Sequence, residues 1–348
     1  MQTVGLVFAC MGISILVTPE ILGLSASVKH GSRVEVPRDS FYTHEDLYKI
    51  QKINHGDDTE ARKLYDQVRI LCWIMTSPKN LEKKAVHVRA TWAHRCNKLI
   101  FISSVTNNSF PTVGVDVPEG REHLTGKTMK AFQYVFDHHF DDADWFMKAD
   151  DDTYTILENL RYFLSSQNKD SPIFFGHHIK DKVKHGYFSG GAGYIISKEA
   201  LRKFGTHETN ASTCRQDGGD EDVEFGKCMD NLGVKVGNSY DRFGRSRFHC
   251  YEPATHLIGA YPKWYINFDA HGAKSGPESI SDYAISFHYV SPANMYALEY
   301  FVYHLRPYGL HFKHQELNQD VTISSTFSTS LISVSPRSSL TAIILKIQ

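Results

Sequence analysis

Residues 144–152 read DWFMKADDD, a short and largely apolar run that ends in three consecutive aspartates. The apolar part predicts a buried β-strand over 144–149 that leads directly into Asp150, Asp151 and Asp152. In open sheets built from parallel strands, ligands bind beyond the carboxyl ends of the strands. The aspartate triplet therefore marks the edge of the sheet at which we expect the functional site.

Segments on both sides of this strand alternate between two patterns. Short apolar runs closed by turn residues predict buried strands, and apolar side chains at helical spacing predict helices. Alternating strands and helices indicate an α/β fold, with a mostly parallel sheet flanked by helices. The further predicted strands span 68–75, 98–103 and 173–176, and the predicted helices span 80–92 and 127–140, with one more helix after Thr153.

Both ends of the chain differ in composition from its middle. The first 24 residues are mostly apolar, but the run from Thr3 to Val17 is short for a spanning helix, which needs about 20 residues. This end predicts a signal-anchor, a cleaved signal peptide or a buried helix. Residues 25–66 predict a polar stem with a helix near 45–52, residues 67–312 the folded domain, and residues 313–348 a low-complexity Ser/Thr-rich tail.

Charge and cysteine content narrow the class of protein. The 38 Lys and Arg residues balance 39 Asp and Glu residues, which argues against a protein that wraps a polyanion. Six cysteines are sufficient for two or three disulfides in a secreted domain. Apart from Cys10, five cysteines remain, so one thiol is free or links two chains. Sequons at Asn107 and Asn210 fit a luminal location.

The aspartate triplet has two interpretations. Side chains alternate along a strand, so Asp150 and Asp152 point one way and Asp151 the other. Two such carboxylates can hold a hard divalent cation that also binds a diphosphate. Alternatively, the triplet is a solvated acidic turn that caps the helix after Thr153.

Three other motifs are each ambiguous when taken alone. The glycine-rich segment 186–194 allows a ligand to approach the backbone closely, or forms a tight turn. The acidic segment 218–226 is favourable at a helix start without any catalytic role. His288 lies in a strand-like run, where an isolated histidine is more often a packed core residue. The Gly126-Lys127-Thr128 run lacks the first glycine of a phosphate loop, since Arg121 stands at that position.

Taken together, eight segments resemble the β-1,3-glycosyltransferase family 31, and within it the core 1 β-1,3-galactosyltransferases. The resemblance covers about Tyr65 to Pro307 and implies a GT-A type nucleotide-sugar glycosyltransferase fold. The segments are RILCW (69–73), LEKKA (81–85), ATW (90–92), KAFQY (130–134), DADWFMKADDDTY (142–154), SGGAGY (189–194), ED (221–222) and YFVYHLRPYG (300–309).

This resemblance implies an inverting, Mn²⁺-dependent enzyme that transfers galactose from UDP-galactose. The acceptor would be O3 of GalNAc that is α-linked to Ser or Thr of a glycoprotein, and the product would be the core 1 O-glycan. It also implies a single-pass type II membrane protein of the Golgi with a luminal catalytic domain, acting as a homodimer.

Carried over position by position, the resemblance assigns a role to individual residues. Asp150, Asp152 and His288 would hold Mn²⁺, a donor set that suits manganese better than magnesium. Asp222 would be the general base that accepts the proton of the acceptor hydroxyl. Trp264 and Tyr265 would stack on the acceptor. The residues implied for the donor nucleotide sugar are Met75, Thr76, Arg89, Lys148, Asp151, Gly190 and Gly191.

The chain departs from the family in two places. A cysteine pair usual in the family is absent, because 278–282 reads ESISD, and a cysteine stands instead at Cys250. The aromatic stretch of the acceptor site is altered over 264–271. Two alternatives therefore stay open: a related β-1,3-glycosyltransferase with another acceptor, and a non-catalytic paralogue that acts as a folding partner. The intact aspartate triplet argues against the paralogue.

Overall fold

The computed structural model describes residues 57–207 and 210–310. The apolar N-terminal segment, most of the predicted stem including its helix near 45–52, and the Ser/Thr-rich tail lie outside this part of the chain. Among the described residues, none of the helices combines the length and the apolar character that crossing a bilayer requires. The predictions about membrane anchoring therefore stay predictions.

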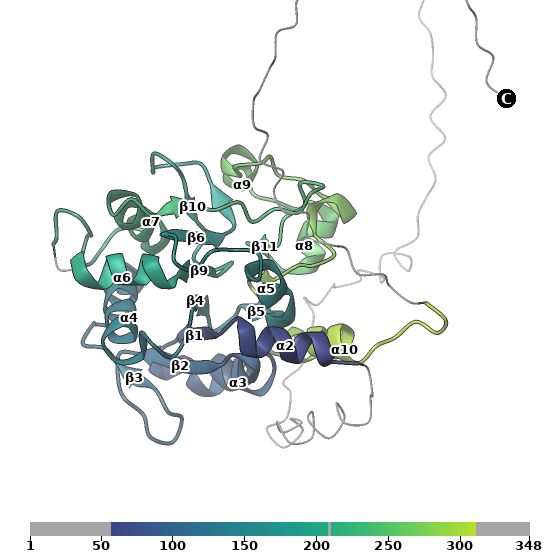
Figure 1. Cartoon of the computed structure of the whole chain (residues 1–348), viewed down its shortest axis with the longest axis horizontal. Helices are drawn as coiled ribbons and strands as arrows, with labels where there is room; N and C mark the ends of the chain where they lie inside the picture. The colour runs from purple at the N-terminus through teal and green to yellow at the C-terminus, as the bar shows by residue number, and fades with distance from the viewer. Residues whose placement is uncertain (1–56, 208–209, 311–348) are drawn as a thin grey trace, which may run out of the picture. The chain divides into compact units, whose positions relative to one another are not determined.

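A seven-stranded sheet forms the centre of the domain. Its strands, in spatial order, are β10 (Lys235–Val236), β6 (Ile173–Gly176), β9 (Tyr194–Ser197), β4 (Trp145–Asp150), β1 (Ile70–Met75), β2 (Lys98–Ser103) and β3 (Val113–Gly114). Figure 1 shows this order from the top of the view downward. Only β9 runs antiparallel to its neighbours, β4 and β6. The other pairs are parallel, which confirms the predicted mostly parallel α/β fold.

Helices cover both faces of this sheet (Figure 1). One face carries α4 (Leu124–His139), α6 (Lys198–His207) and α7 (Glu221–Asn231). The other face carries α3 (Val86–Ala90), α5 (Leu157–Leu164) and α10 (Pro292–Tyr303). Aromatic rings fill the first interface: Phe132 of α4 meets Trp73 of β1 edge-on, with the ring centroids 5.1 Å apart. Such buried contacts fix the strands whose ends form the site.

Smaller elements complete the domain beside the sheet. The short strands β11 (Phe248–His249), β12 (Ser286–Phe287) and β5 (Tyr154–Thr155) form a second sheet, and β7 (His178–Ile179) pairs with β8 (Tyr187–Phe188). Helices α8 (Pro253–Ile258) and α9 (Lys263–Phe268) follow β11. Helix α2 (Thr59–Gln67) lies within the range predicted as stem, and the ring of Tyr65 packs under the Arg161 guanidinium.

Two predicted helices take a different form. The helix expected over 80–92 consists of a 3₁₀ turn (Pro78–Asn80), a π-helical turn (Leu81–Ala85) and then α3. The helix expected after Thr153 begins only at Leu157, because Tyr154 and Thr155 pair with β12 instead. The aspartate triplet is therefore followed by a strand rather than by a helix start, so the helix-capping interpretation is wrong.

Two disulfides cross-link the domain, as the cysteine count predicts. They join Cys72 to Cys96 and Cys214 to Cys228. Cys250 is the free cysteine of the described residues. Its side chain is buried, with 3% exposed, so it is not available to link two chains.

A buried ion pair anchors α10 to the body of the domain and yields a stability prediction. Both oxygens of Glu299 accept hydrogen bonds from the Arg95 guanidinium, and the two side chains are 1% and 8% exposed. Removing one partner of a buried pair costs about 3–5 kcal/mol, and Arg95 would keep only a longer contact, of 3.7 Å, with the half-buried Glu158. Glu299→Ala should lose that much unfolding free energy in urea. Asp141→Ala removes a 90% exposed carboxylate that is paired with Lys198, and it should leave the midpoint of urea unfolding unchanged.

Candidate active site

A cleft of about 1000 Å³ opens where β1 and β4 end. Met75 and Thr76 enter it at the end of β1, and the aspartate triplet enters it at the end of β4. This is the position that ligands occupy in parallel sheets. The rest of the lining includes the segments 119–122, 189–191, 219–223 and 250–251, together with Lys84, Lys127, Trp264, His288 and Tyr289.

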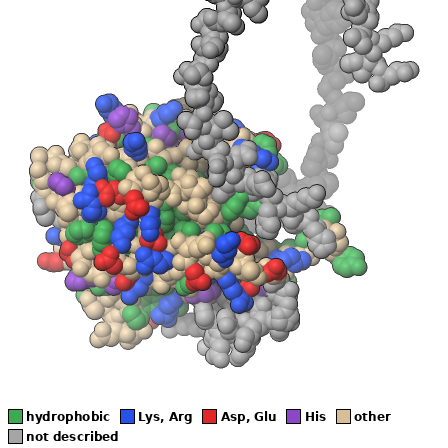
Figure 2. Space-filling view, in the orientation of Figure 1, with side chains coloured by type: hydrophobic (Ala, Val, Ile, Leu, Met, Phe, Trp, Pro, Cys, Tyr) green, Lys and Arg blue, Asp and Glu red, His purple; other side chains and the backbone are tan. Residues whose placement is uncertain are grey.

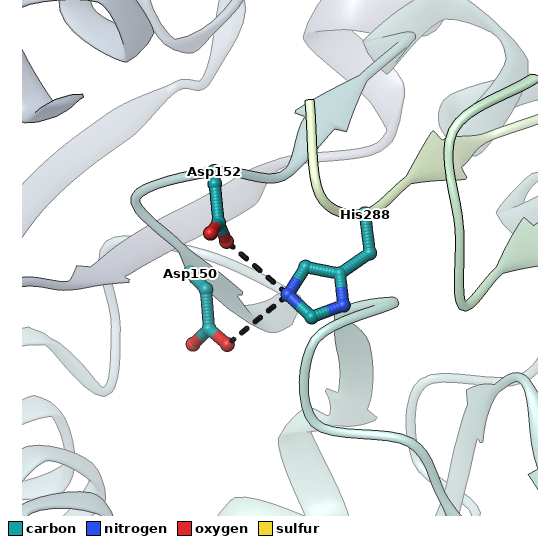
Figure 3. Close-up of side chains that lie close together, drawn as sticks. All are labelled: Asp150, Asp152 and His288. Carbon is teal, nitrogen blue, oxygen red and sulfur yellow. Dashed lines mark ion pairs between the residues drawn. The ribbon is translucent and has the colours of Figure 1, made fainter. Parts of the chain in front are cut away.

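Asp150, Asp152 and His288 converge in this cleft as a candidate metal site (Figure 3). The His288 Nε2 atom lies 3.2 Å from an Asp152 oxygen and 4.0 Å from an Asp150 oxygen. The loop after β12 delivers His288, and β12 pairs with β5 directly after the triplet. Two carboxylates and an imidazole are a donor set that fits a divalent transition metal such as Mn²⁺. His288 thus lies in the cleft beside two carboxylates rather than in the packed core.

Asp151 lies outside this group, as the sequence predicts, although β4 ends at Asp150 and the separation therefore arises in the turn that follows. One of its oxygens accepts hydrogen bonds from the Thr76 hydroxyl and the Asn80 amide, each at 2.9 Å. Burial raises the pKa of Asp151 to about 6, although these donors and Lys84 oppose the rise. The carboxylate therefore lies at the floor of the cleft, beside the residues that follow β1.

Lys84 supplies positive charge to two aspartates of the triplet from within the cleft lining. Its Nζ atom lies 2.8 Å from Asp152 and 3.5 Å from Asp151. Burial of Asp152 opposes its ionisation, but His288 and Lys84 outweigh this effect and hold the pKa of Asp152 well below its ordinary value. The Asp152 carboxylate is therefore ionised at neutral pH, which is the form that binds a cation. Sequence analysis did not assign Lys84 to the site.

The glycine-rich loop closes one wall of the cleft. Gly190 and Gly191 line the cleft, and a Cβ atom at Gly191 would overlap the His288 ring. The Gly190 amide donates to Asp222, and the Gly190 carbonyl accepts from Lys148. These two glycines are therefore needed for the close packing of site residues, as well as for any approach by a ligand.

Lys148 lies beneath the cleft floor rather than in its lining. Its side chain is 2% exposed, and its Nζ atom lies 2.6 Å from Asp150. A weaker contact of 3.6 Å joins it to Glu221. From this position Lys148 orients the carboxylate of Asp150 and does not reach a bound nucleotide directly.

The adjacent acids Glu221 and Asp222 begin α7 and have different environments. Glu221 is buried and accepts hydrogen bonds from the Thr128 hydroxyl and the Tyr194 hydroxyl. Asp222 lies in the cleft, where one oxygen accepts from the Gly190 amide at 3.1 Å. Burial raises the pKa of Asp222 above its ordinary value. Burial raises the pKa of Glu221 as well, and both carboxylates line the cleft, but Asp222 is the more exposed of the two and is therefore the better placed candidate for a general base.

Two residues assigned from sequence lie elsewhere. Arg89 is exposed, and its guanidinium stacks on Phe110 at 4.3 Å from the ring centroid, outside the cleft lining. Tyr265, on the buried side of α9, is 3% exposed and packs against Tyr261. Neither side chain lines the cleft, because helical periodicity turns Arg89 outward and Tyr265 inward. Trp264, with 45% of its surface exposed, does line the cleft.

The part of the cleft between the end of β1 and the start of α4 contains residues that sequence analysis missed. Lys127 at the start of α4 donates to Glu119 at 2.8 Å and to the Thr76 carbonyl at 3.2 Å. Gly120 and Arg121 lie beside Glu119 in the lining. The Gly126-Lys127-Thr128 run is not a phosphate loop, yet its lysine reaches the site. The one available signal was a lysine in the first turn of a predicted helix, where the helix dipole does not favour a positive charge.

Acidic and basic side chains are interspersed on the face of the molecule in Figure 2. This arrangement matches the balanced count of 38 basic and 39 acidic residues. A concentration of negative side chains lies instead in the cleft, at the aspartate triplet.

Comparison with known proteins agrees with this geometry. The Fringe-like family profile matches residues 66–249. The chain is 44% identical to glycoprotein-N-acetylgalactosamine 3-beta-galactosyltransferase 1 of Xenopus laevis over 263 residues, which cover 74% of this chain and 73% of the relative. It is 27% identical to human beta-1,3-glucosyltransferase over 69% of this chain and 46% of that protein, and 29% identical to human chondroitin sulfate synthase 3 over 46% and 20%. The chain therefore belongs to the Fringe-like family and is a glycosyltransferase.

Proposed function

We propose that this enzyme transfers galactose from UDP-galactose to O3 of GalNAc α-linked to Ser or Thr of glycoproteins, with inversion at the anomeric carbon. The observation that carries the proposal is the presence of the Asp150, Asp152 and His288 group and the carboxylate of Asp222 in one cleft. The identity to a relative that is named for this activity supports the choice of donor and acceptor.

The proposed cofactor is Mn²⁺, held by Asp150, Asp152 and His288. When bound, such an ion offsets the negative charge of a nucleoside diphosphate leaving group. Lys84 adds a second positive charge beside the same carboxylates. Lys148 holds the Asp150 carboxylate from below, so the geometry of the group is preorganised before a ligand arrives.

The nucleotide would lie between the ends of β1 and the start of α4. Met75, Thr76 and Lys127 line this end of the cleft. Asp151 is available to the ribose through the oxygen that Thr76 and Asn80 leave free. The galactose would then rest against the backbone of Gly190 and Gly191, within reach of Asp222.

Asp222 would accept the proton of the acceptor hydroxyl as its oxygen attacks the anomeric carbon. The bond from oxygen to carbon forms while the bond from that carbon to the diphosphate breaks, and UDP departs. The Gly190 amide fixes the orientation of the base by its hydrogen bond. The acceptor sugar would stack on Trp264, the exposed indole at the opposite end of the cleft.

We extend the proposal to location and assembly. The apolar N-terminal segment and the two sequons support a type II protein of the Golgi membrane with a luminal catalytic domain. The two disulfides support an oxidising compartment. The exposed side chains of Tyr300 and Phe301 on α10, at 54% and 58%, support a homodimer that covers them.

A panel of donors and acceptors tests the proposed function. With Mn²⁺, the purified chain should transfer galactose from UDP-galactose to a GalNAc-bearing peptide, and mass spectrometry should detect the added hexose. UDP-glucose and UDP-GlcNAc serve as donor controls, and glycolipids and non-mucin glycans as acceptor controls. Transfer to one of these other acceptors alone would replace the proposed acceptor. Failure with every donor, despite copurification with an active galactosyltransferase, would favour a folding partner.

A further inference from the structure

His177 is a buried imidazole that the proposed chemistry does not use. It follows β6 directly, its side chain is 0% exposed, and its ring stacks on Tyr265 of α9 with centroids 5.3 Å apart. Its Nδ1 atom lies 2.8 Å from the carbonyl oxygen of Phe248. Because a carbonyl only accepts, Nδ1 carries a proton and donates, and Nε2 is left for a second partner.

That second partner is Asp269, the residue that ends α9. The Nε2 atom of His177 lies 3.0 Å from an Asp269 oxygen, and the carboxylate is 4% exposed. Burial alone would lower the pKa of His177, but Cys250, Tyr240 and Asp269 outweigh burial and raise that pKa well above its ordinary value. Because Nδ1 already carries a proton, the 3.0 Å approach of Nε2 to a carboxylate oxygen is favourable only with a proton between them, so the contact is a buried pair that is costly to break on one side only.

The chain on either side of Asp269 is fastened to the neighbourhood of His177 as well. The Lys180 amide donates to the Phe268 carbonyl at 2.8 Å, and the Ala270 amide donates to the His178 carbonyl at 3.0 Å. These bonds and the ion pair fix the last turn of α9. Since α9 has only six residues, fixing its end also fixes Trp264, which projects into the cleft.

The backbone of His177 reaches the opposite wall of the cleft. Its carbonyl oxygen accepts from the Ser189 amide at 3.0 Å. The next residue, Gly190, donates its amide to Asp222. His177 therefore makes two contacts. Its backbone bonds the loop that orients the proposed base, and its side chain bonds the end of α9, the helix that carries Trp264.

We propose that the His177–Asp269 pair positions the acceptor by holding Trp264 at a fixed place relative to Asp222. The inference rests on the proposed function, because it takes Trp264 and Asp222 as the two sides of the acceptor subsite. The pair touches neither the metal group nor the nucleotide end of the cleft. Its loss therefore affects acceptor binding and leaves donor binding unchanged.

Steady-state kinetics of Asp269→Asn test this assignment. The substitution keeps the shape of the side chain and removes its charge. We expect KM for the GalNAc-peptide to rise about tenfold, the scale of a displaced binding group, with KM for UDP-galactose unchanged. Asp141→Asn, which neutralises a surface carboxylate paired with Lys198, should change neither constant. An equal rise of both constants in Asp269→Asn, or no rise in either, would overturn the proposal.

The double variant His177→Gln with Asp269→Asn replaces the ion pair by two neutral amides that can still hydrogen-bond. Its KM for the acceptor should lie between those of the wild type and Asp269→Asn. If the single variant does not fold, the double variant carries the kinetic test alone. A higher acceptor KM at an unchanged donor KM would then support the pair, and parallel changes would contradict it.

Tryptophan fluorescence provides a readout that needs no activity. The chain has four tryptophans, and Trp73, Trp92 and Trp145 are 0%, 0% and 2% exposed, so Trp264 dominates quenching by acrylamide. Asp269→Asn should increase that quenching, and Trp264→Phe should remove the difference. Unchanged quenching would contradict the positioning role. If the wild type transfers nothing to GalNAc acceptors, the proposed function fails, while this comparison still tests the pair.

Discussion

Asp222→Asn should abolish transfer and leave UDP binding intact. The carboxylate of Asp222 lies in the cleft and is held by the Gly190 amide, and asparagine keeps that hydrogen bond because its carbonyl oxygen still accepts. The amide cannot take the proton of the acceptor hydroxyl. We expect kcat to fall by about 10²–10⁴-fold, the usual contribution of a general base. Activity assays and calorimetric titration with UDP measure the two quantities.

The matched control for this variant lies on the same helix. Asp230→Asn removes a carboxylate of α7 that pairs with His185, away from the cleft lining. It should leave kcat unchanged, which separates loss of the base from damage to α7. Turnover retained by Asp222→Asn within a few-fold of the wild type would remove Asp222 from the role of base. Loss of UDP binding would instead indicate a structural role.

Chelation of divalent cations should remove transfer, and Mn²⁺ should restore it. His288→Ala and Asp152→Ala each remove one donor side chain of the candidate metal group. Neither variant should therefore regain full activity at any Mn²⁺ concentration. A divalent ion contributes several kcal/mol to the stabilisation of a charged transition state, which corresponds to a loss on the order of 10³-fold. Activity measured against Mn²⁺ concentration reports both effects.

A stability measurement makes this metal prediction independent of turnover. Mn²⁺ that binds only the folded chain raises its melting temperature, and the increase should disappear in His288→Ala. His185→Ala, at a 58% exposed histidine paired with Asp230, should keep the increase and the activity. Full activity of His288→Ala in the presence of a chelator would contradict the metal site.

The sheet was predictable from sequence because its strands depend on local patterns, and the aspartate triplet was visible at the end of one of them. The apolar run before Asp150 predicts β4, and the structure ends β4 at Asp150, so the separation of Asp151 from Asp150 and Asp152 arises in the turn that follows the strand. His288 became interpretable only through the family resemblance, since a single histidine has no spacing to reveal its partner. The structure supplies that partner through the pairing of β12 with β5.

The acceptor end was less predictable because it depends on tertiary packing. Tyr265 and Trp264 are neighbours in sequence, yet one ring is buried and the other is exposed, since consecutive residues point to different sides of a helix. The approach of His177 to Asp269 joins residues 92 positions apart and has no sequence signal. Arg89 was misplaced for a similar reason: its motif is adjacent to the site, but its side chain points out of α3.

The anomeric configuration of the product tests the central claim most directly. Proton NMR should follow the first turnovers with UDP-galactose, a GalNAc-peptide and Mn²⁺, and the new anomeric signal should show the large coupling of a β-linkage, with the linkage at O3 of GalNAc. That result shows inversion at the anomeric carbon, as expected for the single displacement in which Asp222 is the proposed base. An α-linked product, or no product with any GalNAc acceptor, would contradict the account.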